Sequence, residues 1–220
     1  MAGPRVRPHA LRLARALAIH LGLLWLGWGD LIGLLSEPAR LAFVVVLILS
    51  LAVETSIVQH TVARDEVVAE RVRLASLYWL WLLLLCLLPY ADRRDLLTLP
   101  EGGVRLLGVA LVTTGFALRF TAVLTLGRQF STGVGLQDQH RLVRSGIYRW
   151  VRHPAYLAML LTFSGAPLVF RSVPGLAYAV LMLFVLRARI AAEEALLARE
   201  FGVEYDAYSK QTWRLLPGIW

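Results

Sequence analysis

Residues 74–90 read LASLYWLWLLLLCLLPY, an apolar run without a single charged side chain. A helix needs about 20 mainly apolar residues to span a bilayer, and this run approaches that length. The whole chain has the same character: 58% of its 220 residues are hydrophobic and 17% are charged, whereas about a quarter of a soluble domain is charged. The sequence therefore predicts an all-α, polytopic helical membrane protein.

Further apolar runs lie on both sides of residues 74–90. Three have spanning length, at residues 16–35, 41–58 and 104–126. Two shorter runs, 155–170 and 173–186, are separated only by Arg171 and Ser172, which predicts a tight helical hairpin. We expect about four transmembrane helices, then the hairpin 155–186, whose second helix continues out of the membrane and ends at Phe201-Gly202. The predicted division is an N-terminal transmembrane part, 1–126, and a C-terminal part, 127–220, that contains the hairpin.

Charged residues inside the apolar runs need partners, because an unpaired charge in lipid is costly. Asp30 lies in the first run, Glu54 in the second and Arg119 in the fourth. An ion pair between Glu54 and Arg119 would join two helices.

The basic residues predict the orientation. The formal net charge is +8, and most Lys and Arg lie in the N-terminal arm, the 59–73 loop, the 127–154 loop and the C-terminal segment. The opposite side carries Arg40, Arg93, Arg94, Arg105 and Arg171. This bias places both termini in the cytosol and assigns the basic charge to membrane lipids, not to nucleic acid. Arg-rich, Lys-poor usage favours a GC-rich bacterial source and hence the plasma membrane.

Two polar segments flank the hairpin, so folding should bring them together at its cytosolic end. The first carries a dense set of His, Arg and Tyr, and the second carries an acid pair. Their pattern reads His140-x-Leu142-Val143-x-x-Gly146-x-Tyr148, then Arg152-His153-Pro154-x-Tyr156, then Glu193-Glu194, then Phe201-Gly202-x-x-Tyr205-x-x-Tyr208. It resembles the isoprenylcysteine carboxyl methyltransferase family, and phospholipid N-methyltransferases carry related signatures. The resemblance covers residues 124–220.

The resemblance implies an enzyme that transfers a methyl group from S-adenosylmethionine to a lipophilic acceptor, such as an isoprenylcysteine carboxylate. It implies that the cofactor is bound by His140, Leu142, Val143, Gly146, Tyr148, Arg152, His153, Pro154, Tyr156, Glu193 and Glu194. Arg187 and Arg189, one turn before the acids, are candidates to orient a carboxylate acceptor, and Glu194 is a third catalytic candidate.

Two further residues, Ala158 and Cys86, bear on the predicted site. Ala158 stands where the family usually has glycine, and its methyl group affects the packing there. Cys86 is the only cysteine, so the sequence offers no disulfide and no thiolate metal site. The acceptor's identity and the oligomeric state stay open.

Two other functions are compatible with parts of the sequence. A sterol-type membrane reductase that uses NADPH has a similar C-terminal architecture, but its signature has Asn before the tyrosine and Gly-Glu after it, where this chain has Ala155, Ala158 and Met159. A lipid transporter or scaffold would instead place polar groups near the bilayer midplane in inverted repeats, whereas here they gather at the cytosolic edge.

Overall fold

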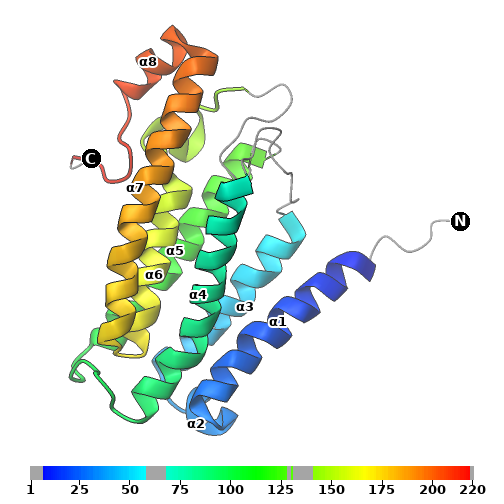
Figure 1. The fold of residues 1–220 in the computed structure, drawn as a ribbon, viewed down its shortest axis with the longest axis vertical. Coiled ribbons are helices and arrows are strands. Elements are labelled where there is room, and N and C mark those ends of the chain that lie inside the picture. The colour runs from blue at the N-terminus through cyan, green and yellow to red at the C-terminus, as the bar shows by residue number, and fades with distance from the viewer. Residues whose placement is uncertain (1–6, 58–67, 128–129, 131–140, 219–220) are drawn as a thin grey trace, which may run out of the picture.

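The molecule is an elongated bundle of long helices (Figure 1). The computed structural model describes residues 7–57, 68–127, 130 and 141–218. The elements within these ranges are α1 (Arg7–Trp28), α2 (Leu31–Leu35), α3 (Pro38–Ile57), α4 (Val68–Arg93), α5 (Val104–Leu126), the 3-10 helix η2 (Gly146–Arg149), α6 (Pro154–Val169), α7 (Val173–Phe201) and α8 (Val203–Ser209). The two ends of the bundle are called below the α2 end and the α8 end.

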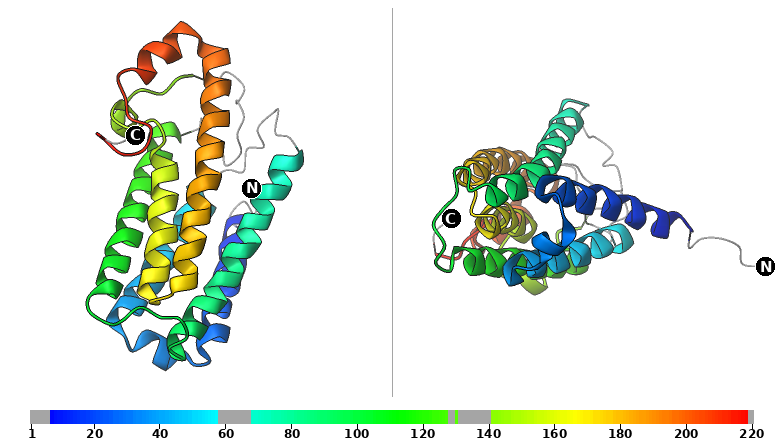
Figure 2. Two further views of the ribbon diagram at one scale, coloured as in Figure 1. Left: turned by 60° about the vertical axis from the view of Figure 1, so that its left-hand side comes forward. Right: turned by 90° about the horizontal axis from the view of Figure 1, so that it is seen from below.

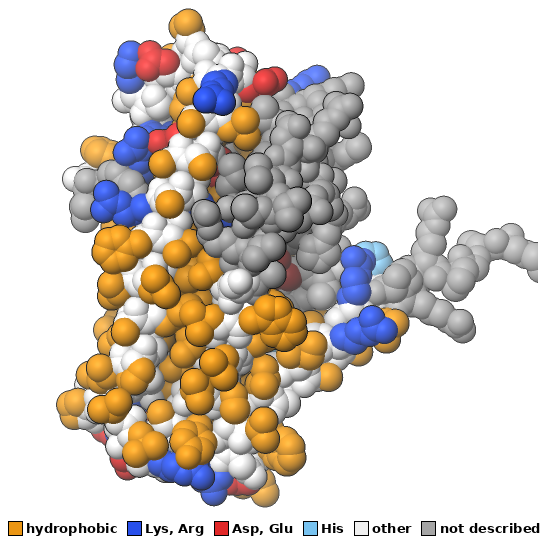
Figure 3. Space-filling view, in the orientation of Figure 1, with side chains coloured by type: hydrophobic (Ala, Val, Ile, Leu, Met, Phe, Trp, Pro, Cys, Tyr) orange, Lys and Arg blue, Asp and Glu red, His pale blue; other side chains and the backbone are white. Residues whose placement is uncertain are grey.

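The helices have the length and composition of membrane spans. Four described segments qualify: His9–Trp28, Pro38–Ser56, Val104–Leu126 and Val173–Phe201; α6 is apolar but shorter. The predicted run 74–90 lies within α4. Apolar side chains cover most of the lower part of the described surface, and charged side chains gather at the bottom, near the top and on the helix that projects to the right (Figure 3). The prediction of a polytopic helical membrane protein is confirmed.

The first span is shorter at its C-terminal end than predicted. Helix α1 ends at Trp28, and Gly29, with φ of 96°, turns the chain. Asp30 then caps α2 by accepting a hydrogen bond from the backbone N–H of Gly33, and it pairs with Arg93 at 3.4 Å. The expectation that residues 16–35 form one helix was wrong, because the Asp30 side chain satisfies a backbone N–H in the first turn of a new helix.

The predicted hairpin is confirmed. Helix α6 begins at Pro154, which suits a first helical position because that N–H has no intrahelical partner. Helix α7 begins after Ser172, whose hydroxyl accepts from the backbone N–H of Gly175 at 3.2 Å. It ends at Phe201, where Gly202 adopts φ of 50°. Figure 2 shows α5, α6 and α7 side by side, while the N-terminal half of α1 points away from them.

Helix α5 packs on α6 through small residues, and this is the most extensive helix pair in the described structure. A Cβ atom on Gly108 would lie 2.5 Å from the backbone nitrogen of Val169, and one on Gly165 would lie 2.7 Å from the carbonyl oxygen of Gly108. Ala158 is buried, and its carbonyl oxygen would lie 2.8 Å from a Cβ on Gly115. Close backbone approach through small residues is typical of membrane helices, which gain no hydrophobic energy from each other in lipid.

One buried carboxylate ties the α2 end together. The Asp92 side chain is fully buried and accepts from Arg105 at 2.8 and 3.0 Å and from Arg171 at 2.9 Å. Arg40 lies 3.4 Å away and stacks on Trp28 with its Cζ atom 4.1 Å from the ring centroid. Four chain segments therefore meet at Asp92.

The predicted pair inside the bundle is present as well. Arg119 Nε of α5 donates to Glu54 Oε1 of α3, and its Cζ atom lies 5.5 Å from the ring centroid of Phe130. The pair removes two isolated charges from the apolar part of the bundle.

We expect Gly108→Ala to destabilise the protein by about 1–3 kcal/mol, because the added methyl group must push α5 and α6 apart. Gly22→Ala on α1 is the matched control, since a Cβ there meets nothing within 4 Å. Thermal unfolding in detergent compares the two. A Gly108 variant as stable as the Gly22 variant would contradict the close packing.

We expect Asp92→Asn to cost about 3–5 kcal/mol, because removing one partner of a buried ion cluster leaves the others uncompensated. Asp95→Asn is the control: the Asp95 side chain is 73% exposed although it also pairs with Arg171, and exposed pairs contribute about 0–1 kcal/mol. Similar unfolding temperatures for the two variants would show that Asp92 does not hold the α2 end.

Candidate active site

The site at the α8 end begins where α6 begins. His153 is the N-cap residue of α6, so the preceding Arg152 lies just outside the helix. Residues 208–215, called here the C-terminal strap, run beside this turn. The Arg152 N–H donates to the Trp213 carbonyl at 2.8 Å, and the His153 N–H donates to the Arg214 carbonyl at 3.1 Å. The strap therefore fixes the backbone of Arg152 and His153.

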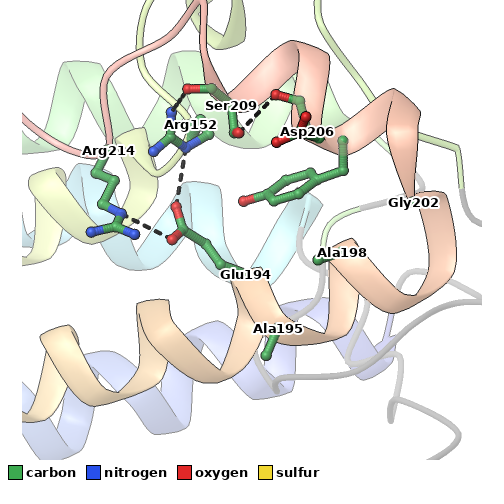
Figure 4. Close-up of a pocket in the computed structure, with 9 residues that line it drawn as sticks. Arg152, Glu194, Ala195, Ala198, Gly202, Asp206, Ser209 and Arg214 are labelled. Atoms are coloured by element: carbon green, nitrogen blue, oxygen red, sulfur yellow. Dashed lines mark hydrogen bonds and ion pairs between the residues drawn. The ribbon is translucent and has the colours of Figure 1, made fainter.

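The Arg152 side chain joins the strap to α7. Its guanidinium donates to the carbonyl of Ser209 at 2.6 Å and to the carbonyl of Thr212. Its Nε donates to Glu194 at 3.0 Å. A planar guanidinium satisfies several acceptors in fixed directions, so this one side chain sets the spacing of three segments (Figure 4).

Glu194 is surrounded by cationic side chains. Besides Arg152, it accepts from Arg214 Nε at 2.9 Å, and its Oε1 atom lies 3.3 Å from His153 Nε2. Its side chain is 13% exposed. The carboxylate on α7 is thus held from the turn that begins α6 and from the strap.

Glu193, its neighbour, has different surroundings. It accepts from the Tyr156 hydroxyl at 2.8 Å, and its Oε1 atom lies 3.9 Å from His153 Nδ1. Its side chain is 34% exposed. The buried Arg189 lies with its Cζ atom 5.7 Å from the Tyr156 ring centroid. Glu193, Tyr156 and Arg189 therefore form a second polar group, between α6 and α7.

Buried tyrosines connect this region to η2 and α8. The Tyr208 hydroxyl donates to the Tyr148 carbonyl at 2.7 Å. Burial raises the pKa of Tyr208 to about 12, although the Arg152 and Arg144 charges oppose the shift. Burial, the Glu193 charge and Tyr208 also raise the pKa of Tyr148, against the Arg119 charge. Both phenols stay protonated at physiological pH, so Tyr208 remains a donor.

A pocket of about 370 Å³ lies between α7 and α8 (Figure 4). Its walls are Arg152, Glu194, Ala195, Ala198, Gly202, Tyr205, Asp206, Ser209 and Arg214. Much of its polar lining is already paired within the protein. The buried Tyr205 hydroxyl is the exception, since it has no hydrogen-bond partner among the described residues.

The sequence around this site matches a known family. The model of the isoprenylcysteine carboxyl methyltransferase (ICMT) family matches residues 107–199, which contain α6, most of α5 and α7, and every predicted site residue. The matched region is similar to this family. The resemblance predicted from the sequence is thereby confirmed.

Individual relatives give the same result. The human protein-S-isoprenylcysteine O-methyltransferase is 35% identical over 115 residues, 51% of this chain and 40% of its own length. The Arabidopsis thaliana protein-S-isoprenylcysteine O-methyltransferase A is 30% identical over 115 residues, 51% of this chain and 58% of its own. A rice relative is 32% identical, and the match covers 62% of it. The chain thus spans less than two thirds of these relatives.

The fold is also similar to a solved structure. The eukaryotic intramembrane Ras methyltransferase ICMT matches with a TM-score of 0.54 at 20% identity, over 99% of this chain and 88% of that one. The comparisons support neither the reductase nor the transporter alternative.

The structure brings most of the ICMT-like residues together at the α8 end. Those that meet there through the contacts above are Tyr148, Arg152, His153, Tyr156, Arg189, Glu193 and Glu194. Pro154 starts α6. Leu142 and Val143 lie half-buried in the segment before η2, which begins at Gly146 with φ of 57°. His140 lies outside the described residues.

Arg187 is placed differently from Arg189. The two residues are about 200° apart around α7, and the Arg187 side chain is exposed while Arg189 is buried. The sequence treated the two arginines alike. Their difference follows from which face of α7 packs on α6.

The sequence did not single out the strap residues Ser209, Thr212 and Arg214. They act through backbone carbonyls, as Ser209 and Thr212 do toward Arg152, or through one ion pair, as Arg214 does. Neither contact leaves a local sequence signal. Only the paired backbone of residues 151 and 213 places them in the site.

We expect Arg152→Lys to loosen the strap, because an ammonium cannot serve acceptors in the strap and on α7 at once. Loss of these charge-assisted hydrogen bonds should cost about 2–3 kcal/mol. The measurement is limited proteolysis of the C-terminal segment, with Arg149→Lys as control, since Arg149 is exposed and contacts the exposed Trp150 ring. Equal cleavage rates would contradict the role given to Arg152.

Proposed function

We propose that this protein is an S-adenosylmethionine-dependent methyltransferase of the membrane that methylates a lipophilic acceptor, such as an isoprenylcysteine carboxylate. One observation carries the proposal: the acid pair of α7 meets Arg152, His153 and Tyr156 at one end of an apolar bundle, inside the region that matches the ICMT family. The activity named for the relatives agrees with this arrangement.

The residues present are suited to this cofactor. S-adenosylmethionine carries a sulfonium, an ammonium, a carboxylate and two ribose hydroxyls. Glu193 uses one hydrogen bond from Tyr156 and is partly exposed, so it keeps acceptor capacity for an ammonium or a hydroxyl. When bound, S-adenosylmethionine supplies an electrophilic methyl group on its sulfonium.

The task of the protein in such a reaction is alignment, because methyl transfer is an in-line displacement. A carboxylate acceptor is itself the nucleophile and needs no general base. A guanidinium can hold one carboxylate oxygen while the other points at the methyl group. We assign this orienting role to Arg189 before Arg187, since Arg189 is buried next to Tyr156.

The apolar bundle explains how such an acceptor would reach the site. An acceptor with a long hydrocarbon chain is concentrated in the bilayer, and apolar side chains cover much of the described surface of the bundle (Figure 3). We place the α8 end in the cytosol, because residues 141–154 and the C-terminal segment there are rich in Arg. A water-soluble cofactor would then enter from the cytosol. A bacterial plasma membrane remains our proposed location.

The test is calorimetric titration of the detergent-purified protein with S-adenosylhomocysteine, with NADPH as the comparison ligand. We expect micromolar binding of S-adenosylhomocysteine alone and an increase in thermal stability in its presence. Transfer of a labelled methyl group to an isoprenylcysteine, and not to cysteine without the lipid, would then establish the acceptor class. Binding of NADPH with no response to S-adenosylhomocysteine would overturn the proposal.

A further inference from the structure

The two acids of the pair differ in what already surrounds them. Glu194 accepts from Arg152 and Arg214, with His153 Nε2 at 3.3 Å. Glu193 accepts a hydrogen bond from the neutral hydroxyl of Tyr156. A carboxylate offers about four acceptor positions. Glu194 therefore has most of its capacity in use inside the protein, whereas Glu193 does not.

The local charges differ in the same way. Arg152 and Arg214 already outweigh the single negative charge of Glu194, so a further cation would be repelled at short range. Glu193 accepts from the neutral hydroxyl of Tyr156, with His153 Nδ1 3.9 Å away and the Arg189 guanidinium beside the Tyr156 ring. A ligand with a positive charge is therefore attracted to Glu193 more strongly than to Glu194.

Exposure separates the acids as well. The Glu193 side chain is 34% exposed and that of Glu194 is 13% exposed. Glu194 contacts Arg152 in the turn before α6 and Arg214 in the strap. These residues lie 42 and 20 positions away from Glu194 along the chain. Removing its charge would weaken the link from α7 to Arg152 and to the strap, while removing the charge of Glu193 would weaken its bond to Tyr156 of α6.

We propose that the acid pair divides its work: Glu194 is a positioning residue that locks Arg152, His153 and the strap in place, and Glu193 is the carboxylate that contacts the cationic part of the cofactor. The second half rests on the proposed function. The first half does not, because the Glu194 contacts exist in the protein alone.

The experiment compares Glu193→Gln with Glu194→Gln, which have the same size and remove the same charge. We expect Glu193→Gln to weaken S-adenosylhomocysteine binding at least tenfold and to leave the unfolding temperature without ligand unchanged. We expect Glu194→Gln to lower that unfolding temperature by several degrees and to speed proteolysis of the strap.

Arg214→Gln is a milder second variant, since its side chain is 43% exposed and it removes only one cation from Glu194. A positioning role predicts that the effects of Glu194→Gln and Arg214→Gln on ligand affinity are not additive, while those of Glu193→Gln and Arg214→Gln are additive. Tyr205→Phe tests whether the ligand sits instead in the pocket between α7 and α8. We expect it to bind S-adenosylhomocysteine as the unaltered protein does.

Opposite results would overturn the proposal. Normal binding by Glu193→Gln, or lost binding by Tyr205→Phe, would remove Glu193 as the ligand-facing acid. Equal unfolding temperatures for the Glu193 and Glu194 variants would remove the anchoring role of Glu194. If the unaltered protein binds no S-adenosylhomocysteine, the proposed function and the Glu193 role fail together, while the unfolding temperatures still decide the Glu194 role.

Discussion

The close packing of α5 on α6 is the constraint on which the rest of the structure depends. Gly108 of α5 and Gly165 of α6 leave no room for a Cβ atom between the two backbones, so the position of α6 is fixed by steric contact. Because α6 starts directly after His153, fixing the helix also fixes the residue that caps it. Helix α7 follows after a short turn and carries the acid pair back to the same end. The site is therefore located by backbone contact between helices.

At each end of the bundle, a carboxylate contacted by basic side chains holds several chain segments together. At the α2 end, Asp92 is surrounded by Arg40, Arg105 and Arg171. At the α8 end, Glu194 is surrounded by Arg152, His153 and Arg214. Buried ion clusters add little net stability because desolvation is costly, but lipid-facing helices have no hydrophobic force between them. Specific polar contacts at the ends therefore help to select one arrangement of the bundle.

The sequence predicted the elements better than their ends and their contacts. The run 104–126 became α5 with the same bounds, because a bilayer requires a continuous apolar helix of a certain length. The prediction of one helix over residues 16–35 was wrong after Trp28, because hydropathy does not show that the short side chain of Asp30 can cap a new helix. The pairing of Glu54 with Arg119 was predictable, since two opposite charges in apolar runs have few other partners.

By itself, the sequence determined the membrane class, the hairpin and many of the residues that meet at the α8 end. Apolar length and motif spacing are properties of neighbouring residues, so they can be read along the chain. Only the tertiary structure decided that Arg189 is buried and Arg187 exposed, that Glu194 is enclosed and Glu193 open, and that the strap holds Arg152. These distinctions depend on which face of α7 packs on α6 and on a backbone pairing between residues 151 and 213, and such long-range geometry leaves no local pattern in the sequence.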